Sequence, residues 1–132
     1  MSTVFATYAP RALPLAFTGY VMAVVLAHVV LPVSWTWLIG FAALLGMLFT
    51  YPVHAALQGA HVRLEVGVSA GFVVAGLLGL LISPIILIAA IAAHGLLDAV
   101  KYVGVGATVP VWYLIGCALF DVAYAAYLTT FL

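Results

Sequence analysis

The fold of this chain is decided by the stretch VGVSAGFVVAGLLGLLISPIILIAAIAAHGLLDAVKYV, residues 66–103, an apolar run of roughly 38 residues. As a single α-helix at 1.5 Å per residue it would be about 57 Å long, nearly twice the thickness of the hydrocarbon core of a bilayer. The run must therefore be broken. Ser83-Pro84 is the strong break signal, because serine suits the N-cap of a helix and proline its first position. The stretch predicts two consecutive membrane-spanning helices.

The rest of the chain has the same character. Of its 132 residues 69% are hydrophobic and 5% are charged, and the mean hydropathy is +1.41. Soluble domains carry about one quarter charged residues, and no water-soluble fold covers itself with so few charges. Three Lys+Arg against three Asp+Glu create no basic field, which excludes nucleic acid as an electrostatic partner. The composition therefore indicates an integral membrane protein whose first partner is the lipid bilayer.

Apolar runs and turn signals predict an all-α protein with five spans in a single transmembrane helical-bundle domain, residues 1–132. The spans cover about residues 13–31, 35–51, 64–81, 84–102 and 110–131. Four spans are the alternative. The first run is too long for a signal peptide and lacks an A-x-A exit, so we expect it to be retained. Pro52 and the polar residues after it indicate the end of the second span. We expect a multi-pass protein of the inner (plasma) membrane.

Basic residues suggest an orientation. With a cytoplasmic N-terminus, Arg11, Arg63 and Lys101 all fall on the cytoplasmic side, in agreement with the positive-inside rule.

Small residues recur at four-residue spacing along the third span, at Gly67, Gly71, Ala75 and Gly79. Such a seam lets a neighbouring helix approach closely in a membrane. We expect this seam to lie at the centre of the bundle or at a contact in a homo-oligomer. A homo-oligomer or a larger membrane complex is therefore the expected protein partner.

Ionisable side chains mark the last two spans. At 100° per residue, His94, Asp98 and Lys101 lie within about 60° of one face of the fourth span. The fifth span has a polar stripe made of Tyr113, Cys117, Asp121 and Tyr124. Two spans joined by a short turn are expected to be neighbours, and the two stripes are therefore predicted to face each other.

Asp121 is the deepest of these groups. At 1.5 Å per residue it lies about 16 Å inside its helix, near the midplane of the bilayer. An ionised carboxylate is costly there, so Asp121 should face the protein interior. We predict His94 and Asp98 as the acid/base or ligand pair of a buried site, Asp121 as its deep carboxylate, and Tyr113 and Tyr124 as hydroxyl donors.

A metal site is a further possibility. His94 and Asp98, assisted by His54, His61 or Asp121, supply the nitrogen and oxygen donors that zinc, iron and manganese accept. The sequence identifies no cofactor beyond this transition-metal hypothesis.

The polar residues also have a purely structural interpretation. In it Asp98 pairs with Lys101 at i,i+3, and His61 pairs with Glu65 at the surface. Lys101, at a helix end, would extend to the membrane interface.

The string Ala93-His94-Gly95-Leu96-Leu97-Asp98, followed by Val109-Pro110-Val111-Trp112-Tyr113, Cys117 and Asp121, resembles a pattern of small, uncharacterised bacterial integral membrane proteins. Their pattern is A-H-G-x-x-D-x-x-H, then P-x-W-[YF], then a cysteine and an aspartate. The resemblance covers the last third of the chain, and Lys101 stands where those proteins often have a second histidine. It implies that His94, Asp98, Cys117 and Asp121 belong together, and it implies no activity.

The leading hypothesis is a small polytopic membrane protein with a buried polar site between the fourth and fifth spans. This site would serve membrane-embedded acid/base chemistry or the binding of a small ligand or ion. Whether the protein is an enzyme is left open. The alternatives are a subunit of an oligomeric transporter or channel, and a structural accessory subunit of a larger membrane complex.

Overall fold

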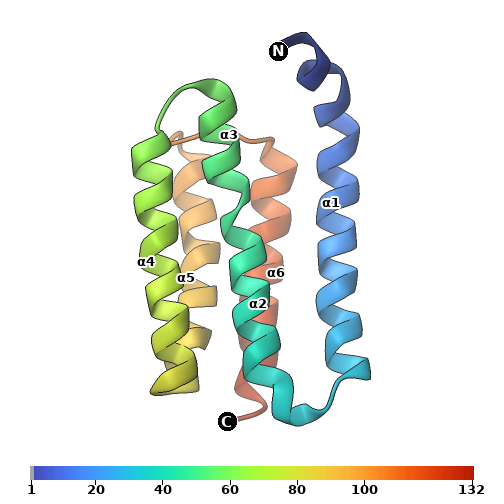
Figure 1. The fold of residues 1–132 in the computed structure, drawn as a ribbon, viewed down its shortest axis with the longest axis vertical. Coiled ribbons are helices and arrows are strands. Elements are labelled where there is room, and N and C mark those ends of the chain that lie inside the picture. The colour runs from blue at the N-terminus through green and yellow to red at the C-terminus, as the bar shows by residue number, and fades with distance from the viewer. Residues whose placement is uncertain (1) are drawn as a thin grey trace. The chain divides into compact units, whose positions relative to one another are not determined.

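The computed structural model describes residues 2–132, with side chains from residue 12 onward. Its regular structure is helical throughout (Figure 1): α1 Ser2–Val30, a 3-10 turn Val33–Trp35, α2 Thr36–Leu48, α3 Thr50–Gln58, α4 Val62–Leu81, α5 Pro84–Tyr102 and α6 Val111–Thr129. The side chain of Arg11 lies outside the described residues. The cytoplasmic N-terminus and the inner membrane stay predictions from the sequence.

Five helical segments are long and apolar enough to cross a membrane: Ala12–Val30, Val33–Gln58, Val62–Leu81, Pro84–Tyr102 and Val111–Thr129. This confirms the prediction of five apolar helices rather than four. The chain divides into two compact units, Met1–Val33 and Ser34–Leu132. The first contains α1, and the second contains all the groups discussed below.

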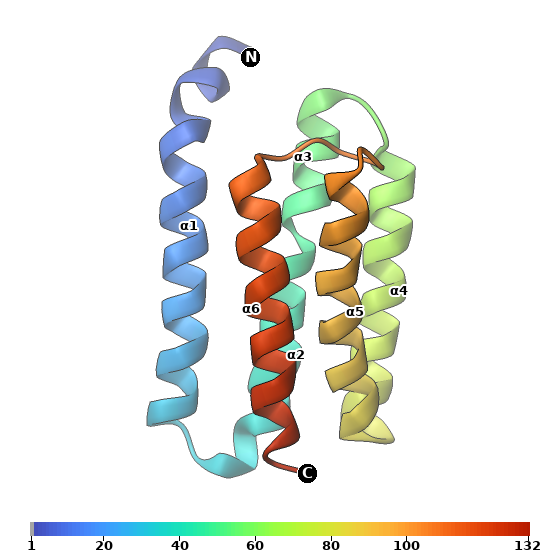
Figure 2. The same ribbon diagram turned by 180° about the vertical axis from the view of Figure 1, so that it is seen from behind.

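In the second unit α5 packs against α2, α4 and α6. Figure 2 shows it between α4 and α6, and Figure 1 shows α3 continuing the line of α2. Side chains from four helices have no exposed surface: Leu44, Ala55, Leu87, Ile91 and Leu128. Dispersion and close packing between these apolar side chains hold a membrane bundle together, since lipid is as apolar as leucine.

The second span is longer than predicted. Pro52 does not end it, because proline is tolerated in the first turn of a helix, and α3 begins at Thr50 and runs to Gln58. Phe49, which joins α2 to α3, has helical dihedral angles (φ −73°, ψ −29°). Since Pro52 has no N–H to donate to the carbonyl of Leu48, that carbonyl accepts a hydrogen bond from the Ser69 hydroxyl of α4 at 3.3 Å. The break in the helix is thus also a contact between α2 and α4.

The break at Ser83-Pro84 lies where the sequence predicts it. Helix α4 ends at Leu81 and α5 begins at Pro84, with Ser83 at the N-cap in an extended conformation (φ −158°, ψ 124°). The Ser83 side chain makes no capping hydrogen bond. The proline and the extended residue before it are therefore enough to reverse the chain.

The predicted packing seam on α4 lies in close contact at Gly79 but not at Gly67 or Gly71. A Cβ added at Gly67 or Gly71 would meet no heavy atom within 4 Å, whereas one at Gly79 would lie 2.5 Å from Cβ of Leu87 and 2.6 Å from its backbone nitrogen. Gly76 packs similarly against Phe41 and Leu44. Of the predicted seam, Gly79 thus lies at the close approach, and Gly76, which the spacing did not include, lies there with it because α2 and α5 pack on that side of α4.

Replacing Gly79 with alanine should therefore destabilise the protein. The new methyl group collides with the backbone of α5, and overpacking of this kind costs about 1–3 kcal/mol. Gly71→Ala is the matched control on the same helix, and it should be neutral or stabilising by up to about 1 kcal/mol through helix propensity. Unfolding by denaturing detergent, followed by tryptophan fluorescence, measures both. Equal stability of the two variants would contradict the close approach of α4 and α5.

Candidate functional site: a buried acid/base group

All the acidic side chains of this protein are buried. Glu65, Asp98 and Asp121 are its three Asp+Glu residues, and each is at most 1% exposed. Acidic residues are almost never fully buried unless they are paired. Their partners therefore indicate what each one does.

Two of these carboxylates lie together with a histidine. Asp98 and His94 are one turn apart on α5, and Asp121 is on α6. Each of the three side chains has one atom that could bind a metal ion, and these three atoms all lie within 4.8 Å of one another. The two predicted polar stripes thus face each other at these three residues, and the predicted buried polar cluster exists.

Hydrogen bonds connect this cluster to a tyrosine. Nδ1 of His94 is hydrogen-bonded to Oδ2 of Asp121 at 2.7 Å, and the same nitrogen lies 4.0 Å from Oδ2 of Asp98. The Tyr51 hydroxyl of α3 donates to Oδ1 of Asp98. We call Tyr51, His94, Asp98 and Asp121 the acid/base group.

Three buried polar atoms of the acid/base group lack a hydrogen-bond partner. Nε2 of His94, Oδ2 of Asp98 and Oδ1 of Asp121 are buried and have no hydrogen-bond partner among the described residues. A buried polar atom without a partner costs about 1–3 kcal/mol. Such atoms in a native structure call for an explanation, and a functional role is one of the recognised ones.

Gly95 sets the distance between the two helices at this level. A Cβ at this position would lie 3.1 Å from Cβ of Asp121 and 3.2 Å from the carbonyl oxygen of Ala118. The missing side chain lets α6 approach α5 closely enough for the imidazole of the preceding residue, His94, to reach Asp121. Phe72 of α4 closes the other side of the imidazole, with its ring edge-on and 5.5 Å away.

The third carboxylate, Glu65, forms an ion pair with Lys101. Nζ of Lys101 lies 2.5 Å from Oε1 of Glu65, and the backbone N–H of Ala107 donates to the same oxygen at 2.8 Å. The Lys101 ammonium also lies 4.2 Å from the centre of the Tyr51 ring, where a cation–π interaction is favourable. This pair joins the start of α4, the end of α5 and the loop that leads to α6.

The ion pair corrects two sequence expectations. Lys101 pairs with Glu65 rather than with Asp98, and it is buried rather than extended to the interface. Glu65 accordingly does not pair with His61 at the surface; His61 is exposed, at the N-cap of α4. The reason is that the antiparallel packing of α4 and α5 brings Lys101 opposite Glu65, whereas Asp98 lies one turn earlier on α5.

The other predicted site residues lie outside the acid/base group. The Tyr113 hydroxyl and the Thr50 hydroxyl are 2.5 Å apart, and the Tyr124 ring stacks on Phe120 and Tyr127. The two weaker metal candidates are His54, which is half-buried, and His61, which is exposed. Neither belongs to the group whose ligand atoms lie together. Nδ1 of His54 instead contacts the carbonyl oxygen of Thr50 at 3.0 Å.

Tyr51 is the site residue that the sequence did not indicate. It stands immediately before Pro52, which suggested the end of a span, but the helix continues and its side chain is buried. The signal available was that proline is also well tolerated in the first turn of a helix.

Cys117, which the resemblance groups with the acids, is buried on α6 as a free thiol. No family model, curated protein or solved structure matches this chain.

Replacing Lys101 with methionine should destabilise the protein by about 3–5 kcal/mol, because it leaves the Glu65 charge buried without its counter-ion. The control is Arg63→Met on an exposed residue of α4, with an expected change within about 0.5 kcal/mol. The double variant Glu65→Gln/Lys101→Met should recover part of the loss, because it contains no unpaired charge. Detergent-induced unfolding measures all three. A single Lys101→Met variant as stable as Arg63→Met would contradict a structural role of the pair.

Proposed function

We propose that this chain is a multi-pass protein of the inner membrane. Its acid/base group exchanges a proton with a small ligand inside the membrane. The observation that carries this proposal is the contrast between the two buried centres. The Glu65–Lys101 pair is balanced in charge, and neither residue is among those with a buried polar atom that lacks a hydrogen-bond partner. The acid/base group, in contrast, has three buried atoms without partners, which a purely structural cluster would not need.

The arrangement of His94 is that of an oriented base. A carboxylate that accepts the Nδ1–H of an imidazole fixes the ring and its tautomer, and it leaves Nε2 as the acceptor of a further proton. A base held in this way by a third group is the arrangement found in nucleophilic and general base catalysis. Asp121 supplies this orientation at 2.7 Å, and Nε2 has no other partner.

The charge of the group also favours proton exchange. Two carboxylates face one imidazole, and burying an unpaired ionised carboxylate costs several kcal/mol. At least one shared proton removes most of this cost. The Tyr51 hydroxyl donates to one oxygen of Asp98, so the other oxygen can accept this proton or a proton of a ligand.

The proposal predicts carboxylic acids that titrate inside the protein. Infrared spectra of the protein in lipid bilayers, recorded as the pH changes, should show a carbonyl band of a protonated carboxylic acid that appears and disappears reversibly. Asp98→Asn and Asp121→Asn should each alter this band, because each removes one proton-binding group and leaves the shape of the side chain unchanged.

Two variants control this experiment. Tyr51→Phe should shift the band without removing it, since it removes one hydrogen bond to Asp98. The double variant Glu65→Gln/Lys101→Met, which contains no unpaired charge, should leave the band of the acid/base group in place. A band that is the same in wild type, Asp98→Asn and Asp121→Asn would overturn the proposal.

A metal ion is the second candidate for this site. One ligand atom each from His94, Asp98 and Asp121 lies within 4.8 Å of the other two, and three protein ligands with an open position are typical of catalytic zinc sites.

Calorimetry distinguishes metal binding from proton exchange at this site. Titration of the purified, chelator-treated protein with zinc or manganese should give one bound ion per chain if this candidate is right, and His94→Ala and Asp98→Ala should abolish the binding. His61→Ala is the control on an exposed histidine. No heat of binding in wild type, or equal binding in His94→Ala, would exclude a metal at this site.

A further inference from the structure

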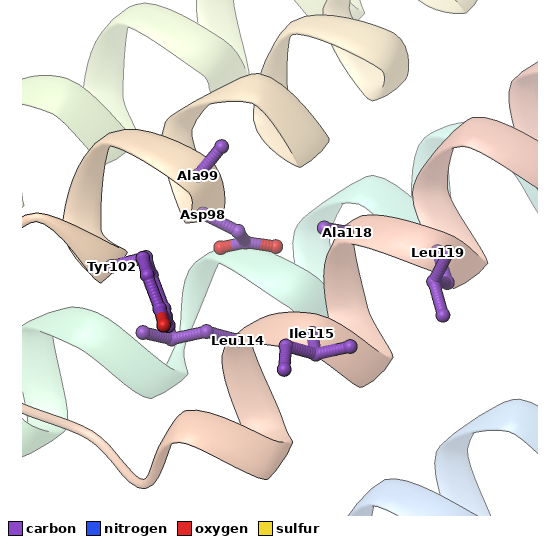
Figure 3. A pocket seen from close by; sticks show the side chains of 7 residues that line it. All are labelled: Asp98, Ala99, Tyr102, Leu114, Ile115, Ala118 and Leu119. Carbon is purple, nitrogen blue, oxygen red and sulfur yellow. The ribbon is translucent and has the colours of Figure 1, made fainter.

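A groove on the bundle leads to Asp98. It lies between α5 and α6, has a volume of about 320 Å³ and is lined by apolar side chains together with Asp98. Figure 3 shows the Asp98 carboxylate between the two helices, with Ala99 and Tyr102 on its own helix and Ile115, Ala118 and Leu119 on α6. Tyr102, Ile115 and Leu119 are exposed, whereas Asp98 is fully buried. The carboxylate thus forms the inner wall of the groove, and apolar side chains form its rim.

The inner wall has an acceptor without a partner. Oδ1 of Asp98 accepts the Tyr51 hydroxyl, but Oδ2 is buried and has no hydrogen-bond partner among the described residues. Its nearest described cationic or potentially cationic neighbour is Nδ1 of His94 at 4.0 Å, and that nitrogen is already hydrogen-bonded to Asp121. An N–H or O–H donor that reached this oxygen would complete its hydrogen bonding.

We propose that the groove binds the ammonium head of a single-chain lipophilic amine, which enters sideways from the lipid. This inference rests on the proposed function, since Asp98 belongs to the acid/base group, and it names the class of ligand that would exchange a proton there. An N–H of the ammonium donates to Oδ2 of Asp98, and the alkyl chain lies along Ile115, Ala118 and Leu119. The ligand proton then has an acceptor inside the protein.

Charge selects an amine over a neutral or anionic amphiphile. The acid/base group contains two carboxylates against one imidazole, and the one buried ammonium of the described chain, Lys101, is paired with Glu65. An anionic head would add a like charge, whereas a cationic head balances the excess carboxylate. A hydrogen bond between ionised partners is about twice as strong as one between neutral groups.

Size selects a single chain. Pockets for small molecules start at about 300 Å³, so a groove of about 320 Å³ has space for a head group and the first part of one alkyl chain. It has no space for the glycerol backbone and two acyl chains of a phospholipid. The lipid around the protein is therefore not expected to compete strongly.

A second groove of the chain provides an internal control. It lies between α4 and α5, has a volume of about 360 Å³, and is lined by apolar residues such as Gly71, Phe72, Ala75 and Ala89. No ionisable side chain lines it. A ligand that binds by its alkyl chain alone should occupy both grooves, and one that binds through its head should occupy only the groove at Asp98.

The experiment uses the full chain in phosphatidylcholine nanodiscs and a dodecylamine with a photoreactive diazirine on its chain. Mass spectrometry after illumination identifies the labelled residues. We expect labels on Ile115 and Leu119, with strong competition by dodecylamine and weak competition by dodecanol. Asp98→Asn should weaken the competition by dodecylamine about tenfold or more, since a hydrogen bond to a charged group is lost.

Two phenylalanine variants on the same helix are the matched pair. Ala99 lines the groove at Asp98 and Ala89 lines the other one, and both side chains are exposed, so both variants should fold. Ala99→Phe should abolish the labels on Ile115 and Leu119 and retain the titrating infrared band. Ala89→Phe should leave the labels unchanged.

Several results would overturn the inference: equal labelling of the two grooves, unchanged labelling in Ala99→Phe, or equal competition by dodecanol and dodecylamine. Crosslinks at Leu119 showing that a second copy or another segment of the chain covers the groove would also overturn it. A titrating infrared band without localised labelling would reject this inference alone. Localised labelling that depends on Asp98, without a titrating band, would support amine binding and reject proton exchange.

Discussion

A carboxylate inside an apolar helical bundle has to find its partners within the protein, since lipid and packed side chains supply none. This constraint organises the contacts of α3 to α6. Glu65 ties the start of α4 to the end of α5, and Asp98 ties α5 to α3 through the Tyr51 hydroxyl. Asp121 ties α6 to α5 through His94. Each carboxylate thus fixes one helix against another, at a definite register that apolar packing alone would leave free to slide.

The two buried centres use the same chemistry to different ends, and Tyr51 touches both. Its ring lies under the Lys101 ammonium and its hydroxyl reaches Asp98. One centre has equal and opposite charges and a backbone N–H as additional donor, as expected of a structural clamp. The other has more acceptors than donors. A surplus of acceptors beside an apolar groove is the arrangement that a protonated ligand requires.

Much of this fold can be predicted from the sequence, and the features that cannot be predicted share one physical cause. Local signals suffice for the break at Ser83-Pro84 and for the five apolar helices. Helical spacing places His94 and Asp98 on one face of α5, and the short connection to α6 predicts that this face lies opposite Asp121. The Glu65–Lys101 and Tyr51–Asp98 contacts join residues 36 and 47 positions apart, and no local pattern encodes them. The same limit applies to the glycines of α4, since spacing does not tell which face meets α5.

The Glu65–Lys101 pair also has a consequence for the biogenesis of the protein. Glu65 leaves the ribosome 36 residues before its counter-ion, so α4 is made before the cation that balances it. Until α5 follows, that carboxylate has to be protonated or remain near the headgroups. The two helices are expected to enter the bilayer as a hairpin, with the charge pair closing last.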